Sequence, residues 1–139
     1  MISNITEATE HPANMSTAII KLKKKMLLHF FREETFVFPS SELFGPHALV
    51  LGLLTEHAGM LRMVDKILFY IEDGDLERAS DRLAGLHRLL VVHCDREERE
   101  VYKKLEESGT IHEIAAMAAN KRLPNGWKPL IAARYDRKS

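Results

Sequence analysis

The stretch HFFREETFVF at residues 29–38 has a near copy, HCDREEREVY, at residues 93–102. Both copies read H-x-x-R-E-E-x-x-V-aromatic, and the histidine and first glutamate of each are four positions apart. On a helix, residues four apart lie about 40° from each other on the same face. Each copy can therefore point an imidazole and a carboxylate at one spot, a pairing that suits a metal ion.

The apolar residues around each copy predict that both pairs face a protein core. On a core-facing helical stripe, large hydrophobic residues recur three, four, seven and eight positions apart. Such residues are Leu22, Met26, Phe36 and Val37 around His29 and Glu33, and Leu83, Leu86, Leu90, Val101 and Leu105 around His93 and Glu97.

The two glutamates, Glu33 and Glu97, are the reason to expect a metal rather than an ordinary core. Buried carboxylates without a compensating cation would each cost several kcal/mol or would take up a proton. A divalent ion removes this cost, so the repeat predicts a metal site. The alternative is a pair of solvent-facing His/Glu contacts within helices, which are common.

Helix signals divide the chain into three long helices and one short helix. Proline and glycine mark the breaks, and Ser108-Gly109 is a typical C-cap. The short helix has capping-box spacing between Thr110 and Glu113. The expected helices run from about Asn14 or Ser16 to just before Pro39, from Gly45-Pro46 to the turn at Asp73-Gly74-Asp75, from about Leu76 to Glu107, and from Thr110 to about Asn120.

Three helices of more than twenty residues joined by tight turns predict an all-α, up-down bundle. In such bundles, metal and cofactor sites are built from side chains that project inward from facing helices. Residues 1–122 are expected to form this single domain, and residues 123–139 a C-terminal loop followed by a polar tail.

Composition narrows the class of protein. The chain has 20 basic and 20 acidic side chains, so nothing suggests a nucleic acid or an anionic membrane as a partner. The amino-terminal residues lack the basic start and apolar run of a signal peptide, and the longest apolar stretch is too short for a bilayer. We expect a cytoplasmic protein. Its single cysteine, Cys94, is turned about 100° from His93 and is expected to be structural.

A set of motifs in the three long helices resembles a known family. Residues Met15 to Glu107, about two-thirds of the chain, are similar to the hemerythrin-like, HHE cation-binding family. The resemblance is carried by Leu28-His29-x-x-x-Glu33-Glu34 with Phe38-Pro39, by Glu56-His57, and by His93-x-x-x-Glu97-Glu98 with Tyr102.

In that family a four-helix bundle holds two irons. The ligands are one histidine from the first helix, a His/Glu pair from the second, one histidine from the third and a His/Glu pair from the fourth. The resemblance implies that His29, His57 and His93 are terminal nitrogen ligands, and that Glu33 and Glu97 are bridging carboxylates.

The departure from the family lies at the amino terminus. The first helix of the bundle and its histidine have no clear counterpart, because few residues precede the first strong helical pattern and Pro12 directly follows His11. A bundle without that helix would leave an apolar seam uncovered. We therefore expect two chains to associate as a dimer, each completing the other's bundle.

The expected ligand set leaves the number and identity of the metals open. Three histidines and two carboxylates are fewer ligands than a full di-iron site uses, so the site could hold one iron or two. The missing ligand could come from a second chain, from His11 or from solvent. Mixed imidazole and carboxylate ligation suits iron or manganese better than a structural zinc, although zinc remains an alternative.

The resemblance favours a metal-binding protein, rather than an enzyme, whose open iron coordination binds dioxygen or nitric oxide for sensing, storage or transfer. One alternative is a di-iron, enzyme-like protein that acts in iron–sulfur-cluster repair or peroxide removal. Another is a helical interaction bundle with a degenerate metal site.

Overall fold

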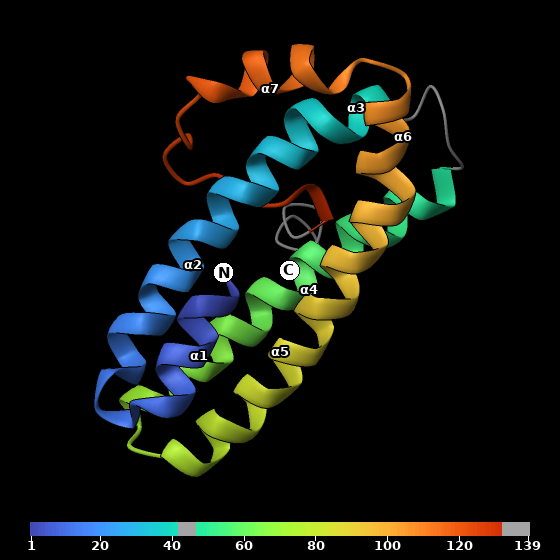
Figure 1. Ribbon diagram of the computed structural model, residues 1–139. Helices are drawn as coiled ribbons and strands as arrows, with labels where there is room; N and C mark the ends of the chain where they lie inside the picture. The colour runs from blue at the N-terminus through green and yellow to red at the C-terminus, as the bar shows by residue number, and fades with distance from the viewer. Residues whose placement is uncertain (42–46, 132–139) are drawn as a thin grey trace. The chain divides into compact units, whose positions relative to one another are not determined.

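The computed structural model describes residues 1–41 and 47–131, and the all-α prediction is confirmed for them (Figure 1). No strand occurs in these two ranges. The helices in chain order are α1 (Ile2–Glu10), η1 (Pro12–Asn14), α2 (Met15–Arg32), η2 (Glu33–Val37), α3 (Phe38–Ser41), α4 (His47–Glu72), α5 (Leu76–Glu97), η3 (Glu98–Tyr102), α6 (Lys103–Glu107) and α7 (Ile111–Ala119).

The third long helix was predicted well by the sequence. Residues 76–107 are helical without a break through α5, η3 and α6. Gly109 follows with a φ of 80°, a left-handed conformation that glycine adopts without steric cost. The predicted helix start at Gly45-Pro46 and the polar tail from Arg134 lie outside the described residues.

The first long helix differs from its prediction, because it continues past Pro39 as far as Ser41. The segment η2 is a π-helix, and the four-residue helix α3 begins directly after it. Pro39 is the second residue of α3. Proline has no N–H to donate to the preceding turn, and in this continuous helix that preceding turn is the widened π-helical turn η2.

Two further differences from the prediction concern α1 and the start of α7. Residues 2–10 form α1, a helix that was not predicted, and it buries Asn4, Ile5 and Ala8. The expected capping box at α7 is not made, because the Thr110 side chain does not cap the helix and its hydroxyl contacts Ser108 and the carbonyl of Leu105 instead.

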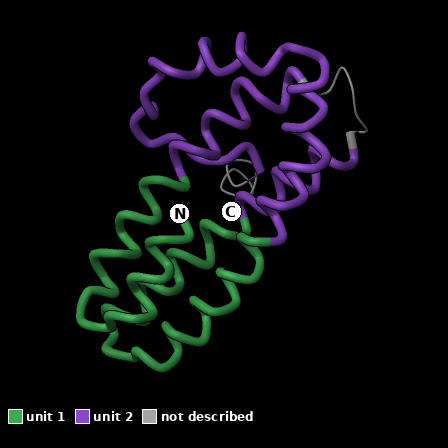
Figure 2. Tube along the Cα trace, in the orientation of Figure 1, with its two compact units in different colours: residues 1–26, 59–91 green, residues 27–58, 92–139 purple. Residues whose placement is uncertain are grey.

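The chain divides into two compact units, residues 1–26 with 59–91 and residues 27–58 with 92–139 (Figure 2). The first unit contains α1 and has an apolar core, and Asn4 is its one buried polar residue within the described chain. This core consists of Ile5, Ala8, Met15, Ala18, Ile19, Leu22, Met26, Met60, Leu61, Val64, Ile67, Tyr70, Ala79, Leu83, Leu86 and Leu90.

The second unit combines an apolar cluster with buried charged groups. Its apolar cluster contains Val37, Phe38, Val50, Leu53, Val101, Leu105 and Ile114. Beside these lie four buried polar side chains, Glu33, His57, His93 and Glu97. Every apolar residue predicted to flank the two motifs is buried, except Phe36, which is half-buried.

No helix in the described residues is both long enough and apolar enough to cross a membrane.

Candidate metal centre

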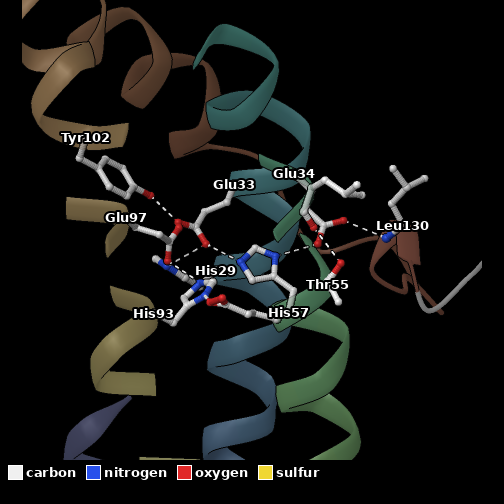
Figure 3. A network of polar contacts seen from close by, with 11 residues as sticks. His29, Glu33, Glu34, Thr55, His57, His93, Glu97, Tyr102 and Leu130 are labelled. Carbon is white, nitrogen blue, oxygen red and sulfur yellow. Dashed lines mark hydrogen bonds and ion pairs between the residues drawn. The ribbon is translucent and has the colours of Figure 1, made fainter. Parts of the chain in front are cut away.

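Four buried side chains of the second unit converge on one point (Figure 3). Glu33 comes from the first turn of η2, His57 from α4, and His93 and Glu97 from the last turns of α5. Each offers one nitrogen or oxygen atom, and these four atoms all lie within 4.8 Å of one another. None of the four residues is more than 2% exposed.

The atoms that face this point are poorly satisfied without a cation. His57 Nε2 lies 3.1 Å from Glu33 Oε1, and His93 Nε2 lies 2.7 Å from Glu97 Oε1. Nevertheless Glu33 Oε1, His57 Nε2, His93 Nε2 and Glu97 Oε2 make no hydrogen bond to any described residue. Because buried polar atoms are normally paired, four such atoms in one place fit the ligand set of a metal ion.

The opposite sides of the two buried imidazoles are held by carboxylates. His57 Nδ1 lies 2.8 Å from Glu34 Oε2, and His93 Nδ1 lies 3.0 Å from Glu56 Oε1. Arg96 in turn donates to the other oxygen of Glu56. This arrangement is typical of metal-binding histidines, since a carboxylate that accepts from Nδ1–H leaves the Nε2 lone pair for the metal.

His29 is the one predicted site residue that lies outside this group of four. Its Nε2 is 3.3 Å from Glu33 Oε1, so it reaches the same carboxylate from the edge of the site. Its side chain is 39% exposed, whereas that of His93, the equivalent residue in the second motif, is fully buried.

Aromatic rings enclose the site. Phe30 stacks on His57 with 3.9 Å between ring centroids, and Phe38 stacks on the same imidazole at 5.5 Å. The hydroxyl of Tyr102 donates to Glu33 Oε2 at 2.8 Å. The two oxygens of Glu33 therefore have different surroundings, one facing the histidines and the other accepting from a phenol.

The two buried glutamates differ in charge in the absence of metal. Burial by itself raises the pKa of Glu33, but its polar contacts with His29, His57 and Glu97 outweigh burial and hold this pKa well below its usual value. Burial and the neighbouring Glu33 carboxylate raise the pKa of Glu97 to about 11. Glu33 is therefore ionised at neutral pH, while Glu97 keeps its proton.

The pKa values of the two buried histidines are also shifted in opposite directions. Burial lowers the pKa of His57, but its contacts with the Glu33 and Glu34 carboxylates more than compensate, and the net shift is upward. For His93, burial dominates and lowers the pKa below its usual value. The metal-free site thus holds a proton on Glu97 that a metal would have to displace, and the raised pKa of His57 also favours its protonated form.

Cys94 and three further histidines are not part of the group of four. His11, His87 and His112 are exposed, and within the described residues none of them lies with the four converging side chains. Cys94 is half-buried, and burial raises the pKa of its thiol, which disfavours the reactive thiolate.

Sequence reasoning assigned no role to Glu34, Glu56 or Tyr102, although the first two stand beside predicted ligands. Glu34 and Glu56 orient the imidazoles, and Tyr102 contacts Glu33. The repeated double glutamate was a usable signal for Glu34. The motif Glu56-His57 marked Glu56 but did not indicate its role, because its partner His93 is thirty-seven positions away on another helix.

The fold and the site together define a helical protein with a buried histidine and carboxylate centre for a cation. The family model described as Hemerythrin HHE cation binding domain matches residues 1–105, and the chain belongs to this family. It is thus a metal-binding hemerythrin-like protein with an all-α hemerythrin-like bundle. The match includes α1, which the resemblance from Met15 onward had left out. No curated protein and no solved structure matches the chain significantly.

Proposed function

We propose that this protein binds non-haem iron through Glu33, His57, His93 and Glu97, with His29 as a fifth ligand. Open positions on the iron would bind dioxygen or nitric oxide for sensing, storage or transfer. The observation that carries the proposal is the set of four buried atoms in one place that lack hydrogen-bond partners among the described residues.

The donor set supports iron over the alternatives. Two imidazoles and two carboxylates form the buried group, and no thiolate belongs to it. Such mixed ligation is typical of iron and manganese, whereas structural zinc sites favour cysteine and histidine in a closed tetrahedron. Glu33 Oε1 lies 3.3 Å from His29 Nε2 and 3.1 Å from His57 Nε2, so one carboxylate oxygen is within reach of two candidate nitrogen ligands.

The surroundings support a small, uncharged ligand. When bound, iron supplies the redox and coordination chemistry that a diatomic gas requires. The chain itself supplies the enclosure, because Phe30 and Phe38 cover His57 with apolar surface. Tyr102 holds one oxygen of Glu33 and thereby keeps the other directed toward the histidines.

Elemental analysis of protein purified without chelators tests the metal. We expect one or two irons per chain in the wild type. Little metal is expected in Glu33→Ala, because it removes the carboxylate that reaches both His29 and His57. The exposed His87 provides a matched control, and His87→Ala should keep its metal. Metal-free wild-type protein that takes up no added Fe²⁺ would support the degenerate interaction bundle instead.

Spectroscopy tests the ligand. Protein loaded anaerobically with Fe²⁺ should change its near-ultraviolet and visible absorption when dioxygen or nitric oxide is admitted, and removal of the gas should reverse the change. A loaded protein whose spectrum does not respond to either gas would contradict this part of the proposal. Sustained turnover of peroxide would favour the enzyme-like alternative.

We also propose that two chains associate. The helix α1 spans nine residues, half the eighteen of α2, so it is short for a bundle helix. Static light scattering at micromolar concentration should give the mass of a dimer. A monomer under those conditions would contradict the proposal.

A further inference from the structure

The two carboxylates behind the buried histidines are held in different ways. Glu56, behind His93, accepts from Arg96, and both lie within the residues matched by the family model. Glu34, behind His57, accepts a hydrogen bond of 2.9 Å from the backbone N–H of Leu130. Leu130 lies twenty-five positions beyond the end of the matched region. This support for Glu34 is therefore a feature of the present chain outside the family domain.

The segment before Leu130 is anchored by other contacts. The rings of Trp127 and Phe31 make a T-shaped contact with 5.6 Å between ring centroids, and Phe31 is next to Phe30, which stacks on His57. The N–H of Trp127 donates to the carbonyl of Pro124 and closes a turn in which Gly126 has a φ of 71°. These contacts bring the backbone of residue 130 to Glu34 independently of the hydrogen bond itself.

Glu34 is in a position to transmit this support to the site (Figure 3). Its side chain is 7% exposed, and both of its oxygens are held, with Leu130 N–H at Oε1 and His57 Nδ1 at Oε2. With both oxygens held, the carboxylate plane has one orientation, and that orientation decides where the His57 ring points. Outer partners of this kind fix the tautomer and the direction of metal-binding histidines.

We propose that the segment Leu123–Leu130 positions Glu34 through the Leu130 amide and so orients His57 toward the metal. The inference rests on the proposed role of His57 as a ligand. Glu34 and Leu130 act here as positioning residues, since neither reaches the metal. The part of the chain beyond the family domain thereby sets how firmly the domain holds its metal.

The matched test is Leu130→Pro against Leu130→Ala. Both remove the same side chain, which is 49% exposed, but only proline also removes the N–H. A pocket of about 400 Å³ borders Glu34 and Leu130, so water can partly replace the lost donor. With Co²⁺ as the probe, we expect Leu130→Pro to release metal to excess chelator about fivefold faster than Leu130→Ala.

A second pair of variants keeps the test valid if proline prevents folding. Glu34→Gln keeps the shape but loses the charge, and it should release Co²⁺ roughly 10- to 100-fold faster than wild type. Glu98, which occupies the same place in the second motif, is exposed, and Glu98→Gln should release Co²⁺ at the wild-type rate.

Two spectroscopic readouts separate positioning from a general loss of stability. The ligand-field bands of bound Co²⁺ should shift in Leu130→Pro and Glu34→Gln. In metal-free protein labelled with ¹⁵N-histidine, the His57 Nδ1–H signal should shift in the same two variants. Equal release rates and unchanged signals in Leu130→Pro and Leu130→Ala would overturn the inference. Wild-type protein that binds no Co²⁺ would instead contradict the proposed function, and the His57 signal would still report whether Leu130 orients the ring.

Discussion

The two copies of the motif, residues 29–38 and 93–102, share their helical geometry and differ in their surroundings. Each contains a π-helical segment, η2 from Glu33 and η3 from Glu98, that begins within one residue of the same motif position. The glutamate four residues after the histidine is buried in both copies, as Glu33 and Glu97. The backbone and the inner carboxylate are thus set by the motif itself.

The other side chains of the two copies differ in burial and in their contacts. The histidine is half-exposed in the first copy and buried in the second. The second glutamate is enclosed as Glu34, where it supports His57, but is exposed as Glu98. The motif thus directs one carboxylate toward the site, while neighbouring segments decide what its other residues do.

The largest difference should appear when the two histidines are removed in turn. His93→Ala takes away a fully buried donor and should weaken metal binding on the order of 100-fold or more. His29→Ala removes a half-exposed group at the edge of the site and should weaken it by roughly 10-fold. Competition with a chromophoric chelator gives both affinities. Equal losses would show that the two copies are equivalent as ligands.

Replacing each inner glutamate by glutamine should change the stability of the metal-free protein by very different amounts. Glu33 is ionised and faces His57, so Glu33→Gln removes a buried ionic partner and should lower the free energy of unfolding by about 1–3 kcal/mol. Glu97 keeps its proton, so Glu97→Gln resembles the native group and should change this free energy by less than about 0.5 kcal/mol.

Urea unfolding of the two metal-free variants checks this prediction. Both variants should also bind metal more weakly, which separates the charge state from the role as a ligand. A larger destabilisation in Glu97→Gln than in Glu33→Gln would reverse the assignment of the protons.

The pH dependence of stability should largely disappear when metal is bound. The folded-state pKa of Glu97 is raised to about 11 and that of His57 is also raised, so above about pH 7 the native metal-free protein holds more protons than the unfolded chain. Its stability should therefore fall as pH rises, on the order of 1 kcal/mol per pH unit. The metal-loaded protein should show almost no slope in this range, because metal binding displaces these protons and the unfolded chain has also lost them above pH 7.

Thermal or urea unfolding between about pH 7 and 9, with and without metal, measures both slopes. Glu97→Gln should flatten the metal-free slope, since it removes one of the two titrating groups. A metal-free slope of the opposite sign would contradict the charge states assigned to Glu97 and His57.

The smallest effects concern the aromatic residue that ends each copy. Tyr102→Phe removes the hydroxyl that donates to Glu33 and should cost about 1 kcal/mol of stability. Phe38→Tyr makes the reverse change at the equivalent position, which is 2% exposed, and the added hydroxyl should cost about 1–3 kcal/mol unless it finds a partner. Because Glu33 shifts when its donor is lost, only Tyr102→Phe should also alter the spectrum of bound Co²⁺.

Much of the fold followed from helical periodicity. The stripes around the two motifs predicted the buried faces, and the glycine turns predicted where the third long helix ends. Helix α1 was not predicted, because only Asn4, Ile5 and Ala8 of its nine residues are buried and the periodic apolar signal is therefore weak. The π-helical segments were not predicted, because one extra residue in a turn barely alters an apolar pattern with three- and four-residue spacing.

Spacing also predicted the inner part of the site, and its outer part needed the structure. Glu33, His57, His93 and Glu97 lie together as four-residue spacing and the family motif implied. The support of Glu34 could not be predicted, because its partner is a backbone amide ninety-six positions away and any residue except proline offers one.

The π-helical segments have a consequence for insertions and deletions. A π-helical turn holds about one residue more than an α-helical turn, so removing one residue from η2 would replace it with α-helical hydrogen bonding, except for the bond that Pro39 has no N–H to donate. Everything after the deletion would then be turned by about 100° relative to the histidine before it. A shortened chain of this kind would stay helical but would direct Phe38 away from His57. This segment therefore has to preserve the angular position of its side chains around the helix axis, and not only its helical structure.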